Sequence, residues 1–139
     1  MVNGSESLSS FKQAIYFNSI GFNLDDTIIY KKRNFAFPSK TRYHQTFEYI
    51  FVLSKDRSPV TFNAIKDRQN IYVGQKSHGK NRTKDGWQQN KGGETRDEMG
   101  MRHNVWEYVT GGGHVSQEKV AHEHPAIFPF KLACDIIYS

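Results

Sequence analysis

Apolar residues are unevenly distributed along this chain of 139 residues, and a long hydrophilic stretch interrupts them. From about residue 56 to residue 113 the sequence is rich in glycine and polar side chains. Only two short runs there, residues 70–73 and 104–110, have the composition of strands. Such low apolar content is typical of a peripheral or inserted element. We therefore expect this stretch to lie beside a core that other segments build.

Two segments have the spacing of helices. Residues 7–20 place apolar side chains on one helical face, which we expect to be buried, with serines at 7–10 as candidate N-caps and Gly21 as the stop. Residues 129–138 have Phe130, Ala133, Cys134 and Ile137 at helical spacing, and Pro129 suits a first turn. The apolar residues of the first face are Leu8, Phe11, Ile15 and Ile20, with Ala14 and Phe17 beside them.

Two further segments have the composition of strands. Residues 27–30 and 47–53 are β-branched and aromatic runs, separated by a polar connection of about fifteen residues that contains Pro38. We expect them to pair as an antiparallel hairpin with a long loop.

Positive charge is concentrated in one part of the hydrophilic stretch. The chain has a formal net charge of +5, and residues 66–91 contain seven basic and two acidic residues, so this window accounts for the whole excess. Polar groups that can bond phosphates or base edges lie between the basic side chains, a composition that favours contact with a polyanion. The alternative is a solvated loop with incidental charge.

Composition excludes several protein classes. Hydrophobic residues make up 37% and charged residues 24%, as in ordinary globular domains, and no apolar run is long enough to span a bilayer. The first fifteen residues lack a secretory signal, so we expect a cytoplasmic protein. The single cysteine, Cys134, allows no internal disulfide, and its apolar helical setting indicates a small buried residue and not a nucleophile.

Histidines near the C-terminus offer a different chemistry. His122 and His124, with His114 and either Glu118 or Glu123, are residue types that bind zinc and other transition metals. Their spacing fits no standard zinc pattern, so we favour a structural or cofactor-edge role and expect no metal site. A small metal-dependent nuclease is the alternative.

The two tryptophans lie in different settings. Trp106 belongs to a strand-like run and is expected in the core. Trp87 lies in the basic stretch, where its ring could stack on a base or cover its own loop.

Five segments follow one another in the order found in one enzyme superfamily. They are residues 11–22, ending Ile20-Gly21-Phe22; Ile28-Ile29-Tyr30 followed by Lys32, Asn34 and Pro38; Phe47-Glu48-Tyr49-Ile50 through Ser54-Lys55; Asn104-Val105-Trp106-Glu107; and His124-Pro125-Ala126-x-Phe128-Pro129-x-x-Leu132. In these segments the chain resembles S-adenosylmethionine-dependent DNA methyltransferases of the amino-methylating type, which modify adenine N6 or cytosine N4. The resemblance spans nearly the whole chain.

The resemblance implies an α/β fold, or α+β as an isolated piece. The chain would form part of a doubly wound methyltransferase sheet with its edge hairpin and a target-recognition insertion. Residues 1–55 would supply a helix and the strand pair, residues 56–113 the insertion, and residues 114–139 the segment that leads into the cofactor-binding strand. An open sheet edge of this kind could be covered by a second copy of the chain.

The resemblance also implies ligands and the residues that meet them. The cofactor would be S-adenosylmethionine, the partner double-stranded DNA, and methyl transfer would proceed without a covalent enzyme intermediate. The implied cofactor-binding positions are His124, Ala126, Phe128 and Pro129. The expected DNA-binding residues are Lys32, Asn34, Lys76, Lys80, Arg82, Lys84 and Trp87, with Asn81 and Gln88 as neighbours that could read sequence.

Two motifs of such enzymes are missing from the sequence. No Pro-Pro pair is present to form the loop that holds the extruded acceptor base, and the glycines at 111–113 lack the preceding Asp-Pro of the cofactor turn, so they read better as a hinge. We therefore expect a fragment that begins after the acceptor loop, ends before the cofactor loop, holds no catalytic residue and binds DNA at most. A stand-alone nucleic-acid-binding module without catalysis is the alternative.

Overall fold

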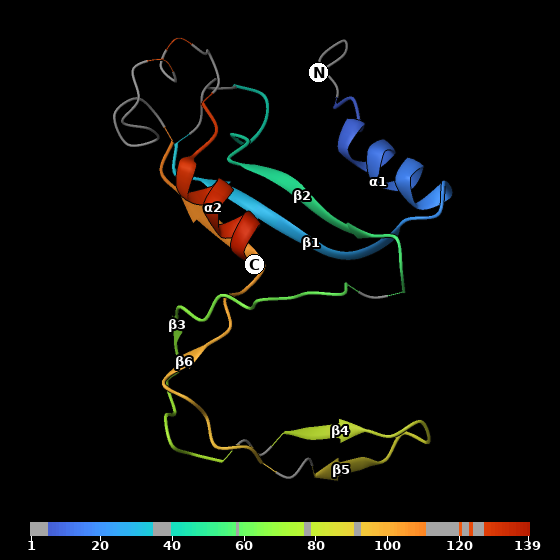
Figure 1. The fold of residues 1–139 in the computed structure, drawn as a ribbon, viewed down its shortest axis with the longest axis vertical. Helices are drawn as coiled ribbons and strands as arrows, with labels where there is room; N and C mark the ends of the chain where they lie inside the picture. Colours follow the sequence, from blue (N-terminus) through green and yellow to red (C-terminus); the bar gives the residue numbers. More distant parts are fainter. Residues whose placement is uncertain are drawn as a thin grey trace. The chain divides into compact units, whose positions relative to one another are not determined.

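The computed structural model describes residues 6–34, 40–57, 59–76, 79–90, 93–110, 120, 123 and 127–139. The chain divides into two units (Figure 1). The sheet unit comprises Met1–Asn63 and Asn104–Ser139, and the ribbon unit comprises Ala64–His103. The ribbon unit lies inside the range 56–113 that the sequence assigns to the hydrophilic stretch.

The sheet unit has a mixed α/β content. Its three-stranded sheet has the order β2-β1-β7, with β1 antiparallel to β2 and parallel to β7. The expected long-looped hairpin is therefore confirmed, and so is a strand within residues 104–110. Both expected helices are also present. The elements are α1 (Ser9–Ser19), β1 (Asn23–Lys32), β2 (Phe47–Ser54), β7 (Val105–Tyr108) and α2 (Phe130–Tyr138).

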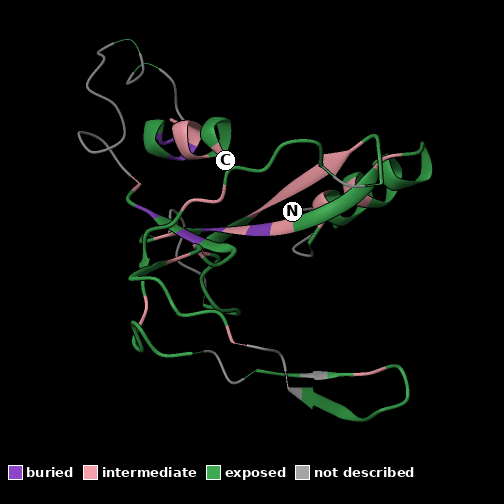
Figure 2. Ribbon diagram, turned by 60° about the horizontal axis from the view of Figure 1, so that its bottom comes forward, coloured by how far each residue is buried: buried purple, intermediate pink, exposed green. Residues whose placement is uncertain are grey.

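One face of this sheet holds the buried core. Alternate residues of a strand point to the same face, so Ile28 and Tyr30 of β1 share a face with Trp106, the register partner of Tyr30. All three side chains are buried, as are Tyr108 of β7 and Leu132 of α2. Figure 2 shows these buried stretches on the strands and on α2. The expected core position of Trp106 is confirmed.

Helix α1 packs on the opposite face. Tyr49 of β2 is the register partner of Ile29, and the ring centroid of Phe11 in α1 lies 5.2 Å from that of Tyr49. The expectation of a buried apolar face on α1 is wrong, because no residue of this helix is buried and Ile15 is 69% exposed. Helical spacing indicates which residues share a face, and it does not supply the neighbour that would cover them.

The ends of α1 differ in their agreement with the sequence. The predicted stop is confirmed, since Gly21 has a φ of 104°, a conformation that glycine adopts without a steric penalty. The predicted serine caps are wrong: Leu8 occupies the N-cap position with a φ of 58°, and no side chain caps the helix. The hydroxyl of Ser7 instead bonds that of Ser9 at 2.6 Å.

The ribbon unit consists of two short antiparallel strand pairs. Strand β3 (Arg68–Gln69) pairs with β6 (Met99–Gly100), and β4 (Lys80–Arg82) pairs with β5 (Gln88–Asn90). The predicted strand at residues 70–73 is wrong, because the chain turns there and Gly74 has a φ of 75°. Its apolar side chains have no core to pack against, and Ile71 is 87% exposed.

The two units differ in how far their residues are buried. Among the described residues of the ribbon unit none is buried, so hydrogen bonds and not an apolar core must define its shape. In the part of the chain that the structure describes, no helix has the length and apolar character needed to cross a membrane.

Candidate nucleic-acid interface

A tight turn joins β4 to β5. Thr83 and Trp87 face each other across it: the Thr83 amide donates to the Trp87 carbonyl at 2.8 Å, and the Trp87 amide donates to the Thr83 hydroxyl at 3.1 Å. The Gly86 amide closes the turn by donating to the Thr83 carbonyl at 3.0 Å, with a φ of 83° at Gly86. A three-residue hairpin connection that ends in a left-handed glycine has this form. The dipeptide Asp85-Gly86 signals such a hairpin in the sequence, and our sequence analysis missed it.

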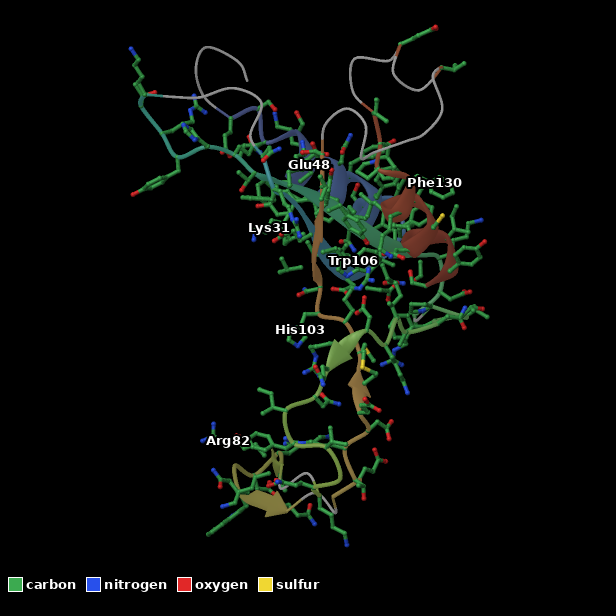
Figure 3. All side chains as sticks on the ribbon, turned by 90° about the vertical axis from the view of Figure 1, so that its left-hand side faces the viewer. Lys31, Glu48, Arg82, His103, Trp106 and Phe130 are labelled. Atoms are coloured by element: carbon green, nitrogen blue, oxygen red, sulfur yellow. The ribbon has the colours of Figure 1, made fainter. Side chains whose placement is uncertain are left out.

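The basic side chains on and beside this hairpin face solvent. The residues concerned, the basic hairpin group, are Lys76, Lys80, Arg82 and Lys84. All are exposed, and none of them forms an ion pair with another described residue. Lys80 and Arg82 are two residues apart on β4 and therefore lie on one face of the strand. Figure 3 shows Arg82 at the edge of the ribbon unit.

Trp87 and Gln88 extend this surface. Trp87 is 78% exposed, so its ring does not cover the hairpin from which it comes. Gln88 is exposed and pairs with Arg82 across the strands. The backbone of Asn81 lies in β4, and its side chain falls outside the described part. Exposed cations, an exposed ring and amides together are the chemistry of a surface that contacts phosphates and bases.

A second polar group in the ribbon unit was missed by the sequence analysis. A hollow of about 520 Å³ is lined by Arg68, Asn70, Ile71, Tyr72, Glu94, Thr95 and Arg96. The lining comes from two segments that are more than twenty residues apart in the sequence. No local pattern could have brought them together.

Of the two predicted DNA contacts on the sheet unit, Lys32 and Asn34, the first has partners within the protein. The Lys32 ammonium forms an ion pair with Glu48 and lies 5.8 Å from the centre of the Tyr30 ring. Burial, and secondarily the charge of Glu48, raises the pKa of the Tyr30 hydroxyl. Asn34 is exposed just beyond the end of β1.

A second ion-pair group lies on the opposite face of the sheet, where Lys31 of β1 and Glu107 of β7 are register partners. The Glu107 carboxylate accepts hydrogen bonds from Lys31 at 2.6 Å and from Arg33 at 3.0 Å. The hydrogen bond from Lys31 is the largest cause of a lowered pKa at Glu107, followed by the bond from Arg33. Lys31 and Glu48 are labelled in Figure 3.

Of the predicted cofactor positions, the structure describes two. Pro129 is the buried N-cap residue of α2, and Phe128 beside it is 56% exposed. This pair fits one apolar edge of an S-adenosylmethionine pocket, but a proline and a phenylalanine side chain supply no hydrogen-bond donor. His124 and Ala126 lie outside the described residues, as do the glycines at 111–113.

The alternative metal site falls mostly outside the described part as well. His114, Glu118, His122 and His124 are not described, and Glu123 is exposed. Among the described residues no cluster of histidine, cysteine and carboxylate side chains could hold a metal ion. Cys134 in α2 is a free, half-buried thiol.

Comparison with known proteins gives a consistent assignment. The N6_N4_Mtase model, described as DNA methylase, matches residues 1–139. The chain is 45% identical over 139 residues to the orphan methyltransferase M.BamHII of Bacillus amyloliquefaciens, in an alignment that covers 98% of this chain and 52% of that protein. The chain therefore spans about half the length of the curated relative it matches. No solved structure gives a significant match.

Proposed function

Because the chain belongs to the family of amino-methylating DNA methyltransferases, we propose that it provides the DNA-contacting part of such an enzyme. The whole enzyme would transfer a methyl group from S-adenosylmethionine to adenine N6 or cytosine N4 in double-stranded DNA. The basic hairpin group is the observation on which this proposal rests. Within the proposal, residues 56–113 are the target-recognition region.

The hairpin places several cations where a DNA backbone can reach them. Lys80 and Arg82 share one face of β4, and Lys84 follows in the turn, each exposed to solvent. Cations that have no ion-pair partner among the described residues gain most from a phosphate, because binding releases condensed counterions and breaks no ion pair in the protein. Lys32, by contrast, would have to leave Glu48 before it could contact DNA. We assign it, with Asn34, a secondary contact.

The chemistry of methyl transfer requires parts that this sequence lacks. The target base must leave the duplex, and an acceptor loop must hold its amine. The sequence contains no Pro-Pro loop of that kind. The bound cofactor would supply the methyl group, and Phe128 and Pro129, together with His124 and Ala126, would form one edge of its pocket. We therefore propose that this chain alone binds DNA and transfers no methyl group.

Exposed apolar surface on the sheet unit favours part of an enzyme over a stand-alone binding module. Ile15 of α1 and Ile20, its C-cap residue, are 69% and 52% exposed, and Phe11 is 45% exposed although its ring meets Tyr49. Exposed apolar faces of this kind mark surfaces that another chain or segment covers. Strands β2 and β7 are the edges of the described sheet, and either could pair with a further strand, including one from a second copy.

A salt titration tests the DNA-binding half of the proposal. The full chain is titrated against a labelled duplex at several salt concentrations, with and without S-adenosylmethionine. A triple variant, K80Q/R82Q/K84Q, should bind more weakly, and the slope of log K against log salt should fall by about 0.9 for each lost phosphate contact. The cofactor should have no effect on binding.

The matched control removes the same charge elsewhere. Lys12, Lys40 and Lys55 are exposed residues of the sheet unit, so K12Q/K40Q/K55Q has the same net charge as the hairpin triple variant. The control should keep the wild-type slope. Equal losses in both triple variants would reduce the effect to net charge, and absence of binding by the wild-type chain would end the proposal.

A further inference from the structure

Two segments of the ribbon unit, residues 68–76 and 95–100, run side by side beyond the short strands β3 and β6. After the β3–β6 pair, the Asn70 amide donates to the Glu98 carbonyl at 2.9 Å, and the Gly74 amide donates to the Arg96 carbonyl at 3.0 Å. An isolated bridge then joins Lys76 to Thr95. These segments continue into β4 and β5, which pair again. They form an irregular two-stranded antiparallel ribbon, a shape that the major groove of B-DNA admits.

One strand of this ribbon bulges at residues 71–74, beside the hollow. The Gln75 amide donates back to the Tyr72 carbonyl at 3.4 Å, and the left-handed Gly74 lets the chain rejoin its partner. The bulge leaves Ile71 and Tyr72 87% and 53% exposed. Extra residues in one strand re-aim side chains in this way, and bulges are common next to functional sites.

Two polar side chains of the hollow are held in place by the backbone opposite. The Arg68 Nε donates to the Met101 carbonyl at 3.1 Å, and the Asn70 Nδ2 donates to the Asp97 carbonyl at 2.8 Å. Gly100 makes room for both. A Cβ at Gly100 would lie 2.5 Å from an Arg68 terminal nitrogen and 2.7 Å from the Asn70 Oδ1.

A third polar side chain is positioned by an aromatic ring. The Arg96 guanidinium lies 5.6 Å from the centre of the Tyr72 ring. A cation at this distance over a ring is attracted by the negative face of the ring. The planar fork of Arg96 is therefore pre-ordered at the edge of the hollow.

The chemistry of the hollow differs from that of the hairpin. Arginine pairs with guanine, asparagine with adenine, glutamate with the cytosine amine, and the threonine methyl group contacts the thymine methyl group. The hollow contains all four side-chain types, and Glu94 would repel a phosphate. The basic hairpin group, by contrast, consists only of cations.

We infer that the hollow reads base edges in the major groove of duplex DNA, while the basic hairpin group holds the adjacent phosphates. Arg68, Asn70 and Arg96 are then the specificity-determining residues. This inference rests on the proposed function, because it requires that the chain bind DNA. It assigns sequence reading to residues that the amino-acid pattern did not single out.

Selection from a randomised DNA pool tests the inference with the full chain. The wild-type chain is used to enrich a duplex from the pool, and affinities are then measured for the enriched duplex and for a scrambled duplex of the same composition. R68K and R96K keep the charge and lose the planar fork. Each should reduce the ratio of the two affinities by roughly 5- to 150-fold, the range for one bidentate base contact. Binding to the scrambled duplex and its salt slope should not change.

Two further variants separate reading from folding and from charge. R82K makes the same substitution in the hairpin and should keep the full affinity ratio, because a phosphate contact needs only a point charge. G100A displaces the Arg68 and Asn70 side chains without touching DNA and should lower the ratio as R68K does. In every variant the backbone amide signals of the ribbon unit should stay dispersed as in the wild type, with shifts confined to residues near the substitution, which shows that the unit remains folded.

Failure of this inference and failure of the proposed function give different results. If R68K and R96K discriminate as well as the wild type, or if the wild-type chain binds DNA and enriches no sequence, the inference is wrong and the proposed function stands. If the wild-type chain binds no DNA at any salt concentration, both are wrong. A lost ratio in R68K and R96K with a retained ratio in R82K supports the inference.

Discussion

Different interactions stabilise the sheet unit and the ribbon unit. In the described part of the chain every buried apolar side chain belongs to the sheet unit, on β1, β7 and α2. The ribbon unit has no buried described residue and depends on hydrogen bonds that water can reach, such as those of Asn70 and Thr83. Isolated two-stranded hairpins are marginally stable in water. The sheet unit is therefore expected to unfold cooperatively, whereas the ribbon unit should open locally at a much lower free energy.

The largest effect is expected in the sheet unit, at Leu132. This side chain is completely buried, and L132A should lower the free energy of unfolding by about 2–5 kcal/mol, because truncation removes apolar contacts and leaves a cavity. Urea denaturation followed by circular dichroism measures the loss. Amide hydrogen exchange in β4 and β5 should be unchanged.

The control for this experiment lies on the same helix. Ile137 is 76% exposed, so I137A makes a similar truncation in α2 without opening a cavity. Its effect should be under about 1 kcal/mol, as is usual for surface positions. If L132A accelerates exchange in β4 and β5 as strongly as in β1, the two units unfold together and the comparison fails.

The sequence predicted helices and strands correctly, and it predicted burial correctly where another element packs on the apolar residues. Both strands of the hairpin, the strand at β7 and both helices were predicted, and Tyr30 and Trp106, from runs of strand composition, are buried on one sheet face. The spacing of Phe130 and Ile137 predicted α2 but not its buried side, because both are exposed and Leu132 is the completely buried residue. The same pattern failed on α1, where Ile15 remains exposed. Periodicity predicts a helix with an apolar face, but it does not predict which other part of the structure packs against that face.

In the ribbon unit the sequence was less informative. The run at residues 70–73 has strand composition, yet it forms a turn because no core rewards an extended conformation there. Arg68 and Arg96 both line the hollow because two segments that are distant in the sequence pair with each other. Only the hairpin turn had a local signal, in Asp85-Gly86. The predicted DNA-binding and cofactor-binding residues stay predictions, and His124 and Ala126 lie outside the described residues.

A smaller effect is expected from a hydrogen bond between α2 and the sheet core. The Tyr108 hydroxyl donates to the Asp135 carboxylate at 2.6 Å. Y108F should cost about 1.5–3 kcal/mol, the usual range for a hydrogen bond to a charged group, and nearer the lower value because Lys131 also pairs with Asp135. Urea denaturation measures the change. Y138F removes a hydroxyl from an exposed tyrosine of α2 and should have almost no effect, so equal losses would refute this role of Tyr108.

A local effect of about 1–2 kcal/mol is expected at the hairpin turn. No atom lies within 4 Å of a Cβ built on Gly86, so the cost of G86A comes from its φ of 83° alone. Amide exchange in β4 and β5 should become faster, while the urea midpoint of the sheet unit stays constant. G86N should recover part of the protection, because asparagine tolerates this conformation better than alanine. A shifted midpoint in G86A would show that the units are coupled.

The smallest effect is a dependence of sheet-unit stability on acid, set by Glu107. Lys31 and Arg33 hold the pKa of this carboxyl below its usual value. A carboxyl whose pKa is lower in the folded state stabilises the fold above the unfolded-state pKa, and that contribution is lost as the pH falls through the folded-state pKa. Since Glu107 is exposed, solvent and salt screen the pairs, and the contribution is small.

E107Q should therefore lower the urea midpoint slightly at pH 7 and remove part of the decline that the wild-type chain shows below about pH 4.5, the usual range for glutamate. The difference should shrink in 1 M salt. E6Q makes the same charge change at an exposed glutamate ahead of α1 and should keep the wild-type pH profile. Identical profiles for E6Q and E107Q would mean that the ion pairs of Glu107 do not stabilise the sheet. The salt slope of DNA binding should be the same in both variants, because the basic hairpin group, on which most of that slope depends, belongs to the ribbon unit and Glu107 to the sheet unit.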